Sequence, residues 1–142
     1  MPSEIKRTIK RMARWSIPPA NCIPNNCIIN IYDEGDCIPL HIDHHDFVRP
    51  FYMVSFMSKS NILFRKEIDI IGLGEFKFSV EIPVLMGSVL ILKLNGTDLA
   101  KHCIPWLRHC RVSVTFRKMD DSKIPYGFRP DPKLEELCPY DL

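Results

Sequence analysis

His41-Ile42-Asp43 is the segment of this sequence whose residue types and spacing most directly suggest chemistry. On a β-strand, positions i and i+2 project to the same face, so the imidazole of His41 and the carboxylate of Asp43 would lie side by side. Together they would supply two ligands of a 2-His-1-carboxylate triad, which holds non-haem Fe(II) and leaves other coordination positions open. The pattern is short, and two unrelated surface residues would produce it as well.

The third ligand of such a triad has to be a histidine later in the chain. His102 and His109 are the two histidines downstream of the cluster. We prefer His102, because it lies in a short predicted strand that follows a turn at 95–98. His109 adjoins Arg108 in a predicted loop, and it stays the alternative at this point.

Residues 111–117 alternate strictly between polar and apolar side chains. An ordinary strand with its polar side in water explains the alternation. A chemical interpretation is also open. At about 3.3 Å per residue, Arg111 and Arg117 stand about 20 Å apart on one face, and side chains that lean inward could bracket a short diacid. Asn30 and Tyr32 share a face of an earlier strand by the same rule and could donate hydrogen bonds to that acid.

The first sixteen residues predict one helix, at 3–16, with Ser3 as its N-cap. The helix ends before Pro18-Pro19. It presents an apolar stripe and a row of cations at spacings i, i+3, i+4 and i+7. That row is either a solvated face over a packed stripe or a surface that meets phosphates. The stripe is Ile5, Ile9 and Met12, and the cations are Arg7, Lys10, Arg11 and Arg14.

After Pro24 the sequence consists of short apolar runs separated by turn residues, at intervals of about 8–12 residues. This spacing predicts a β-sandwich or jelly roll. The segment from Met119 onward is polar and rich in proline, so we expect an ordered loop or a frayed end. The eight predicted strands are 27–32, 38–45, 51–56, 61–64, 75–80, 88–92, 101–104 and 111–117.

Composition and charge narrow the class of protein. The chain has 142 residues and a formal charge of +2, too small for a polyelectrolyte. Its 46% hydrophobic and 25% charged residues are ordinary globular values, which exclude disorder and collagen-like structure. We expect one domain.

Six cysteines occur without a CxxC pair, so a zinc ribbon is not indicated. The charged start 1–7 is not followed by an apolar signal-peptide region, and no apolar run is long enough to span a bilayer as a helix. We therefore expect free thiols in a soluble protein of the nucleus, the cytoplasm or both, neither secreted nor bound to a membrane.

Taken together, these motifs resemble those of the AlkB-like 2-oxoglutarate/Fe(II) dioxygenases. Asn30-Ile31-Tyr32, His41-Ile42-Asp43, His102 and Arg111-x-Ser-x-Thr-x-Arg117 occur in the order and spacing of that family. The stretches 31–39, 46–51, 100–103 and 115–120 look like the plant AlkB homologues that demethylate RNA. The resemblance covers about residues 5–138.

The resemblance implies a mainly β fold: a double-stranded β-helix (jelly roll) of about eight strands with the N-terminal helix packed against it. It implies one dioxygenase domain over 1–142, with a core at 27–118 and an irregular tail at 119–142. Arg111 would pair with the distal carboxylate of 2-oxoglutarate, and Arg117 would lie near the end that chelates iron. The implied Fe(II) ligands are His41, Asp43 and His102, and the implied 2-oxoglutarate contacts are Asn30, Tyr32, Arg111 and Arg117.

The implied reaction is the oxidative demethylation of N6-methyladenosine in RNA, with dioxygen consumed and succinate and formaldehyde released. We expect methylated mRNA as the partner and a monomer as the active form. From geometry we add His45, which shares the face of Asp43 if the strand continues. There it would touch the substrate base or orient a metal ligand. The alternative is a histidine at the rim of the site without a functional role. His44 should point away.

Three departures from the family pattern leave other functions open. Relatives carry a segment before the equivalent of residue 1, part of which forms the lid that grips the nucleotide, and we expect this chain to lack it. Arg65 and Leu94 stand where relatives usually have glycine, and Leu resists the positive φ that such a glycine often marks. One alternative is a truncated, non-catalytic jelly roll that binds RNA or a protein. Another keeps the iron chemistry but acts on a small molecule or a protein.

Overall fold

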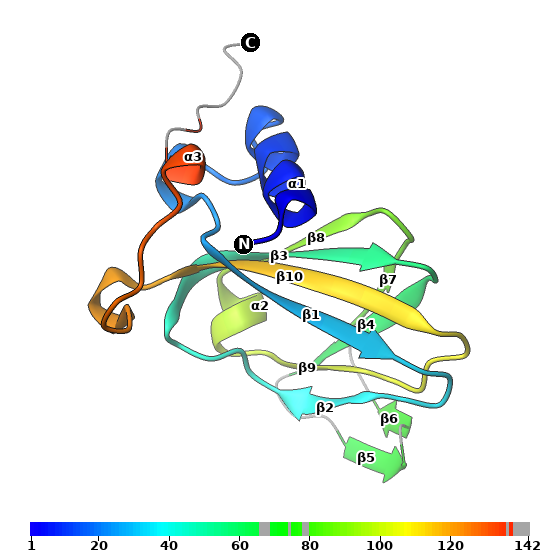
Figure 1. Cartoon of the computed structure of the whole chain (residues 1–142). Helices are drawn as coiled ribbons and strands as arrows, with labels where there is room; N and C mark the ends of the chain where they lie inside the picture. Colours follow the sequence, from blue (N-terminus) through cyan, green and yellow to red (C-terminus); the bar gives the residue numbers. More distant parts are fainter. Residues whose placement is uncertain (66–68, 74, 78–79, 136, 138–142) are drawn as a thin grey trace.

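The computed structural model describes residues 1–65, 69–73, 75–77, 80–135 and 137. Its centre is a pair of four-stranded antiparallel sheets (Figure 1). The major sheet has the order β1 (Asn26–Tyr32), β10 (Arg111–Met119), β3 (Phe47–Phe56) and β8 (Val89–Leu92). The minor sheet has the order β2 (Ile38–His41), β9 (Lys101–Ile104), β4 (Ser60–Arg65) and β7 (Val80–Val84).

The strand pairs are nested in the sequence. β1 pairs with β10, β2 with β9, β3 with β8 and β4 with β7, so the core strands alternate between the two sheets on either side of the β4–β7 pair. A chain folded in this way is a jelly roll, or double-stranded β-helix. The predicted fold class is therefore confirmed. The two sheets hold the eight core strands, and a small hairpin of β5 (Asp69–Gly72) and β6 (Glu75–Lys77) forms a third sheet.

One apolar cluster fills the space between the two sheets. Strands of both sheets contribute to it, for example Phe51 from β3 and Ile62 from β4, which are 0% and 2% exposed. The inward face of β10 is different, because it carries the polar residues of the 111–117 alternation. Its Arg111 and Ser113 are 0% exposed, so the explanation of a strand with its polar side in water is wrong. The polar row lines the interior.

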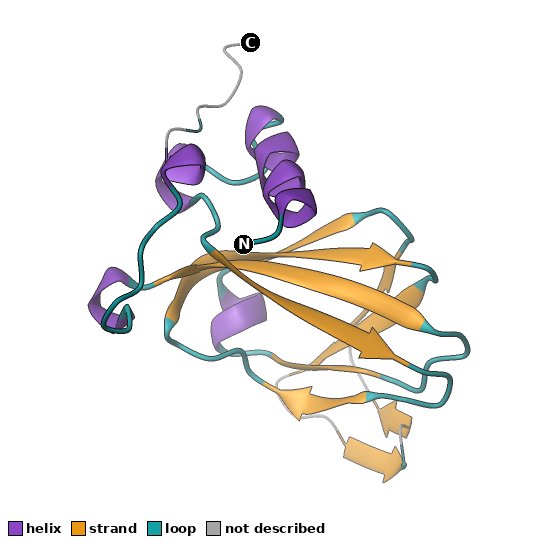
Figure 2. Cartoon of the chain, in the orientation of Figure 1, coloured by secondary structure: helices purple, strands orange, loops and turns teal. Residues whose placement is uncertain are grey.

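α1 (Ser3–Arg14) covers the outer face of the major sheet, on the side away from the minor sheet (Figure 2). Ile9 and Met12 of this helix pack against Val114 and Phe116 of β10. Both faces of β10 are thereby removed from water, one under the helix and one between the sheets. The predicted basic helix with an apolar stripe is confirmed in its extent to within two residues.

The ends of α1 differ in detail from the prediction. Pro2 takes the N-cap position and Ser3 is the first helical residue, so Ser3 as the cap is wrong. Pro suits this place because the first N–H groups of a helix have no intrahelical partner. At the other end Ser16 adopts φ 54°, and its N–H and that of Ile17 donate to Ala13 and Met12. This Schellman pattern ends the helix at Arg14.

Several predicted strands have different bounds in the structure. The strand at 38–45 ends at His41, and the strand at 75–80 is replaced by β6 and by β7, which begins at Val80. β7 includes Pro83. β7 is an edge strand, and an edge strand tolerates a residue that lacks an N–H. β5 was not predicted, and β3 begins four residues before its predicted start.

The remaining described elements are short. They are α2 (Asn95–Asp98), α3 (Pro132–Glu135) and the 3₁₀ turns η1 (Ala20–Cys22) and η2 (Asp121–Lys123). In the described part of the tail, residues 119–135 and 137, turns and one helical turn alternate. Five cysteines carry free thiols, and Cys138 lies outside the described residues. Within the described ranges no helix is long and apolar enough to cross a bilayer.

Candidate metal centre

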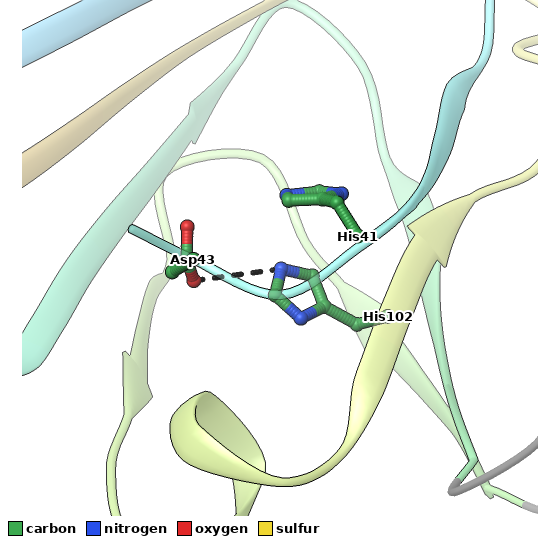
Figure 3. Close-up of side chains that lie close together, drawn as sticks. All are labelled: His41, Asp43 and His102. Carbon is green, nitrogen blue, oxygen red and sulfur yellow. Dashed lines mark ion pairs between the residues drawn. The ribbon is translucent and has the colours of Figure 1, made fainter. Parts of the chain in front are cut away.

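Three side chains from two segments meet at one end of the space between the sheets (Figure 3). His41 ends β2 and His102 lies directly opposite it on β9, where the two residues are register partners. Asp43 follows two residues after His41. One ligand atom of each of the three residues lies within 4.8 Å of the others. The antiparallel pairing of β2 and β9 is thus the feature that brings the two histidines together.

The hydrogen bonds of these residues leave ligand atoms available. The Nδ1 of His41 lies 2.9 Å from the carbonyl of Pro39. A carbonyl only accepts, so Nδ1 carries the proton and the Nε2 lone pair is open to a metal. The Nε2 of His102 lies 3.5 Å from Oδ2 of Asp43. Burial lowers the pKa of His102, and His41 lowers it further, which favours the neutral imidazole that metals bind.

The arrangement fits a divalent cation. Nitrogen and oxygen ligands bind such a metal at about 2.1 Å, so ligands at right angles are about 3 Å apart. The three ligand atoms, which all lie within 4.8 Å of one another, need only small side-chain rotations to reach that spacing. The Oδ2 atom of Asp43 is buried and accepts no hydrogen bond. A buried carboxylate oxygen without a donor is costly unless a cation neutralises it.

A cavity of about 140 Å³ extends from this cluster between the sheets. Polar side chains from β1 and β10 form one wall, and aliphatic side chains form the rest. The Oγ atom of Ser113 is buried there without a hydrogen-bond partner. The cavity is lined by Ile28, Asn30, Ile38, His41, Asp43, Met53, Ile62, Leu92, His102, Ile104, Ser113, Thr115 and Arg117.

Arg111 is a fully buried cation on the inward face of β10. Its Nε donates to Oγ of Ser55 at 3.2 Å, and its Nη2 lies 3.6 Å from Sδ of Met53. Its guanidinium carbon lies 5.6 Å from the centre of the Tyr32 ring. Nη1 has no partner. Among the described residues no carboxylate pairs with this guanidinium, and burial lowers its pKa. The group is therefore suited to an anionic ligand.

Arg117 lies at the other end of the polar row on β10. Its guanidinium stacks at 3.8 Å on the ring of Phe47, and its Nη2 donates to Oδ1 of Asn26 at 3.0 Å. Nε is buried without a partner. Burial lowers the pKa of Arg117, and the charge of Asp43 opposes that shift. Arg117 thus faces the metal cluster, with one donor unsatisfied.

Arg49 organises the loop that carries Asp43. Its Nη2 donates to the carbonyl of Asp43 at 3.2 Å, and its Nη1 donates to the carbonyls of His44 and Phe47 at 3.0 and 2.6 Å. Its Nε pairs with Oδ1 of Asp98 at 2.9 Å. These carbonyls bind a guanidinium where a strand would bind a neighbouring strand, which explains why β2 stops at His41. Asp98 ends α2, three residues before β9 begins. Arg49 therefore connects the loop that carries Asp43 with the segment that leads into the strand of His102.

The structure separates the other predicted residues from the cluster. His45 is exposed in the turn at 45–46 and does not line the cavity. The strand on which its role was based does not reach it, so that premise is wrong. His109 is exposed and lies outside the cluster. The side chain of His44 is 72% exposed and contacts Asp46, in agreement with the expectation that it points away.

Sequence reasoning missed Arg49, Ser55 and Met53. Arg49 precedes Pro50, just before the predicted strand at 51–56, and nothing in that local sequence indicates a functional role. Ser55 lies 56 positions from Arg111 along the chain, so no local pattern connects them. A serine at an inward position of an otherwise apolar strand was the one available signal, since a buried hydroxyl needs a partner.

No family model matches the chain. Similar curated proteins are found by direct comparison. RNA demethylase ALKBH9B of Arabidopsis thaliana is 49% identical over 142 residues, which is all of this chain and 28% of that protein. RNA demethylase ALKBH5 of Xenopus tropicalis is 33% identical over 113 residues, 78% of this chain and 31% of that protein. The chain therefore spans less than a third of the length of these relatives.

A second Arabidopsis protein, RNA demethylase ALKBH10B, is 24% identical over 116 residues, 82% of this chain and 20% of that protein. Among solved structures, that of OsALKBH1 overlays with a TM-score of 0.49 and 19% identity, covering 81% of this chain and 60% of that chain. This overlay is loose, and the jelly-roll assignment rests on the nested strand pairing described above.

Proposed function

Because this chain belongs to the AlkB-like family of 2-oxoglutarate- and Fe(II)-dependent dioxygenases, we propose that it catalyses the oxidative demethylation of N6-methyladenosine in RNA. RNA as the substrate class follows from the names of its relatives. The metal cluster, the cavity that it adjoins and the buried Arg111 support the chemistry.

His41, Asp43 and His102 are the proposed Fe(II) ligands. They come from β2, β9 and the loop after β2 and all three line the cavity, so an ion that they held would adjoin the space in which a co-substrate could bind. When bound, the iron couples decarboxylation of 2-oxoglutarate by dioxygen to hydroxylation of an N-methyl group, which then leaves as formaldehyde. The protonated Nδ1 of His41, held by Pro39, keeps that ring in the tautomer that presents Nε2.

Arg111 is the proposed partner of the distal carboxylate of 2-oxoglutarate. Its Nη1 is the unsatisfied donor, and Ser55 holds the guanidinium by its Nε. Tyr32 and Asn30 follow on β1, which pairs with β10 so that Tyr32 is opposite Arg111 and Asn30 opposite Ser113. We assign both as further hydrogen-bond donors to the co-substrate.

Arg117 is the proposed contact for the end of 2-oxoglutarate that reaches the iron. It lies at the metal side of the polar row, and its Nε is unsatisfied. The aliphatic walls, among them Ile38 and Leu92, would keep water away from the reacting methyl group. His45, on the exposed turn after Asp43, stays a predicted contact for the methylated base at the rim.

The observation that carries the proposal is the meeting of His41, Asp43 and His102 at a cavity whose polar wall includes β10, the strand that also carries the buried Arg111 with its unsatisfied Nη1. The test is turnover of a single-stranded RNA containing N6-methyladenosine with Fe(II), 2-oxoglutarate and dioxygen. We expect succinate and formaldehyde in equal amounts, and neither product from His41→Ala.

Two outcomes of this test would contradict the proposal. Absence of succinate under all conditions, with iron bound, would favour a non-catalytic module. Succinate formation that methylated RNA neither stimulates nor inhibits would leave the iron chemistry in place and move the substrate to a small molecule or a protein. Unmethylated RNA of the same sequence is the control for RNA-independent decarboxylation.

A further inference from the structure

A groove runs between α1 and the adjoining end of the major sheet, apart from the metal centre. It measures about 460 Å³. Its walls are α1 and the segment after it on one side, and β3, β8 and the turn before β8 on the other. We call it the α1 groove, and it is lined by Arg7, Thr8, Arg11, Met12, Trp15, Ile17, Val54, Phe56, Gly87 and Val89.

Cations dominate the helix side of the α1 groove. Arg7 and Arg11 are one helical turn apart and both line it. A second hollow of about 410 Å³ continues around the helix and adds Lys10 and Arg14. None of the described residues that line the two hollows is acidic, and Glu4, one turn before Arg7, is the acid of α1. A surface of this kind attracts a polyanion and favours phosphate contacts.

Two aromatic rings are exposed in the same groove. Trp15 is 70% exposed and Phe56 is 38% exposed, although both are large apolar side chains. Exposed aromatic rings beside arginines form the platform on which single-stranded nucleic acids bind, with bases stacked on the rings and phosphates on the cations. A duplex would leave the rings without partners, because its bases are stacked on each other.

The α1 groove lies on the opposite side of the major sheet from the metal centre. α1 packs on the outer face of that sheet, whereas His41, Asp43 and His102 lie between the sheets (Figure 1). The metal centre lies about half of the sheet spacing, about 5 Å, to one side of the major sheet, and the groove extends about one helix diameter, about 10 Å, on the other, so the two sites are about 15 Å apart. A nucleotide at the metal centre and nucleotides in the α1 groove must therefore belong to different parts of one strand.

We propose that the α1 groove is a second binding site for single-stranded RNA, which holds nucleotides that flank the methylated one. The inference rests on the proposed function for the choice of RNA as the polyanion. It adds that affinity for long RNA and affinity for a single methylated nucleotide depend on different surfaces of the protein.

The test measures binding of the whole 142-residue chain to a labelled, unmethylated single-stranded RNA of about 15 nucleotides. The variants are Trp15→Ala and the double variant Arg7→Gln/Arg11→Gln, all at residues that line the groove. Tyr126→Ala and Lys123→Gln are matched controls, because both residues are exposed and lie outside the groove. Circular dichroism melting checks that each variant is folded.

We expect Trp15→Ala to weaken binding of the long RNA by about 5- to 150-fold, the range for loss of one stacked base. We expect the double variant to reduce the slope of log affinity against log salt by about 1.4, since each phosphate contact to a single strand contributes about 0.7. The controls should change neither quantity. Affinity for N6-methyladenosine 5′-monophosphate should be the same in all variants.

Equal affinity of the groove variants and the controls for the long RNA would overturn the proposal. So would an equal loss of affinity for the long RNA and for the mononucleotide, since that would place the effect at the metal centre. A protein-binding groove would give the first of these results. Binding needs no turnover, so a protein that fails to demethylate RNA can still support the second site, and an active protein can still refute it.

Discussion

Replacement of Arg111 by methionine should have opposite effects on folding and on co-substrate binding. Arg111 is 0% exposed, its Nη1 has no partner, and no described carboxylate neutralises it. Its polar contacts include the hydroxyl of Ser55 and the thioether of Met53, and Tyr32 lies beside it and favours its charged form. The folded protein without ligand therefore contains a buried charge that is only partly solvated by dipoles. Such a charge opposes folding until an anion binds.

The magnitudes follow from this environment. Exchange of buried ionic groups for apolar side chains of similar volume is often neutral or stabilising by about 1–4 kcal/mol. Loss of two charge-assisted hydrogen bonds to a carboxylate, at about 1.5–3 kcal/mol each, weakens 2-oxoglutarate binding by about 10²- to 10⁴-fold. We therefore expect Arg111→Met to unfold at the wild-type temperature or a few degrees above it, and to bind almost no 2-oxoglutarate.

The assay is thermal unfolding with and without 2-oxoglutarate, together with calorimetric titration of 2-oxoglutarate in the presence of Mn(II). The wild type should show a rise in Tm with 2-oxoglutarate, because a ligand that binds only the folded state stabilises it. Arg111→Met should show none. Arg111→Lys keeps the charge without the planar fork and should give an intermediate affinity. Arg108→Met, at an exposed arginine, is the matched control and should leave both quantities unchanged.

One combination of results would refute this reasoning. If Arg111→Met lost several kcal/mol of stability and still bound 2-oxoglutarate within about threefold of the wild type, Arg111 would be a structural cation. Its partner would then lie within the protein, and the carboxylate pairing would be wrong.

Four further outcomes test other parts of the structure. His41→Ala should weaken Mn(II) binding by at least about 100-fold in a calorimetric titration and leave the fold intact, since the residue is only half-buried. Arg49→Lys should weaken Mn(II) binding by about 10- to 100-fold, because an ammonium cannot span the loop carbonyls and Asp98 together. Ser55→Ala should raise the KM for 2-oxoglutarate by about 2- to 12-fold at unchanged kcat, the effect of one hydrogen bond. Leu94→Gly should stabilise the protein by about 0.5–1 kcal/mol in urea denaturation, because Leu94 has φ 53°.

Three of these four substitutions have a matched control in the same chain. His109→Ala should leave Mn(II) binding unchanged, since His109 is exposed and outside the cluster. Ser60→Ala, at a buried serine of the minor sheet, should leave the KM for 2-oxoglutarate unchanged. Leu99→Gly should lower stability where Leu94→Gly raises it. A fall in kcat with Ser55→Ala, or equal losses of stability from both leucine substitutions, would contradict the interpretation of the corresponding site.

Local periodicity was sufficient to predict much of the fold. The helical repeat at 3–16 and the strict alternation at 111–117 are properties of neighbouring residues, and both elements form where they were predicted. The turn-punctuated runs after Pro24 predicted a β-sandwich or a jelly roll, and the resemblance to a family favoured the jelly roll. The ends of elements were less predictable, because β2 stops where Arg49 binds the backbone of the following loop, and no pattern within 38–45 reports that contact.

Prediction of the candidate site required contacts between residues that lie far apart in the chain. The pair of residues at 41 and 43 was visible in the sequence, but the choice between His102 and His109 depended on the resemblance to a family until the pairing of β2 with β9 placed His102 opposite His41. The partners of Arg111 on β3 are more than fifty positions away from it. Contacts of this separation are set by strand register, which no short window of sequence contains.

The two faces of β10 also separate what the sequence determines from what only the tertiary structure decides. Alternation establishes that Arg111 and Arg117 share one face and Val114 and Phe116 the other, because successive side chains of a strand point in opposite directions. It does not establish which face is turned inward. Only the packing of α1 over the apolar face, with the second sheet over the polar one, turns the arginines toward the metal cluster. The physical reason is that burial is decided by what covers a strand, and the covering elements, α1 and the minor sheet, come from other parts of the chain.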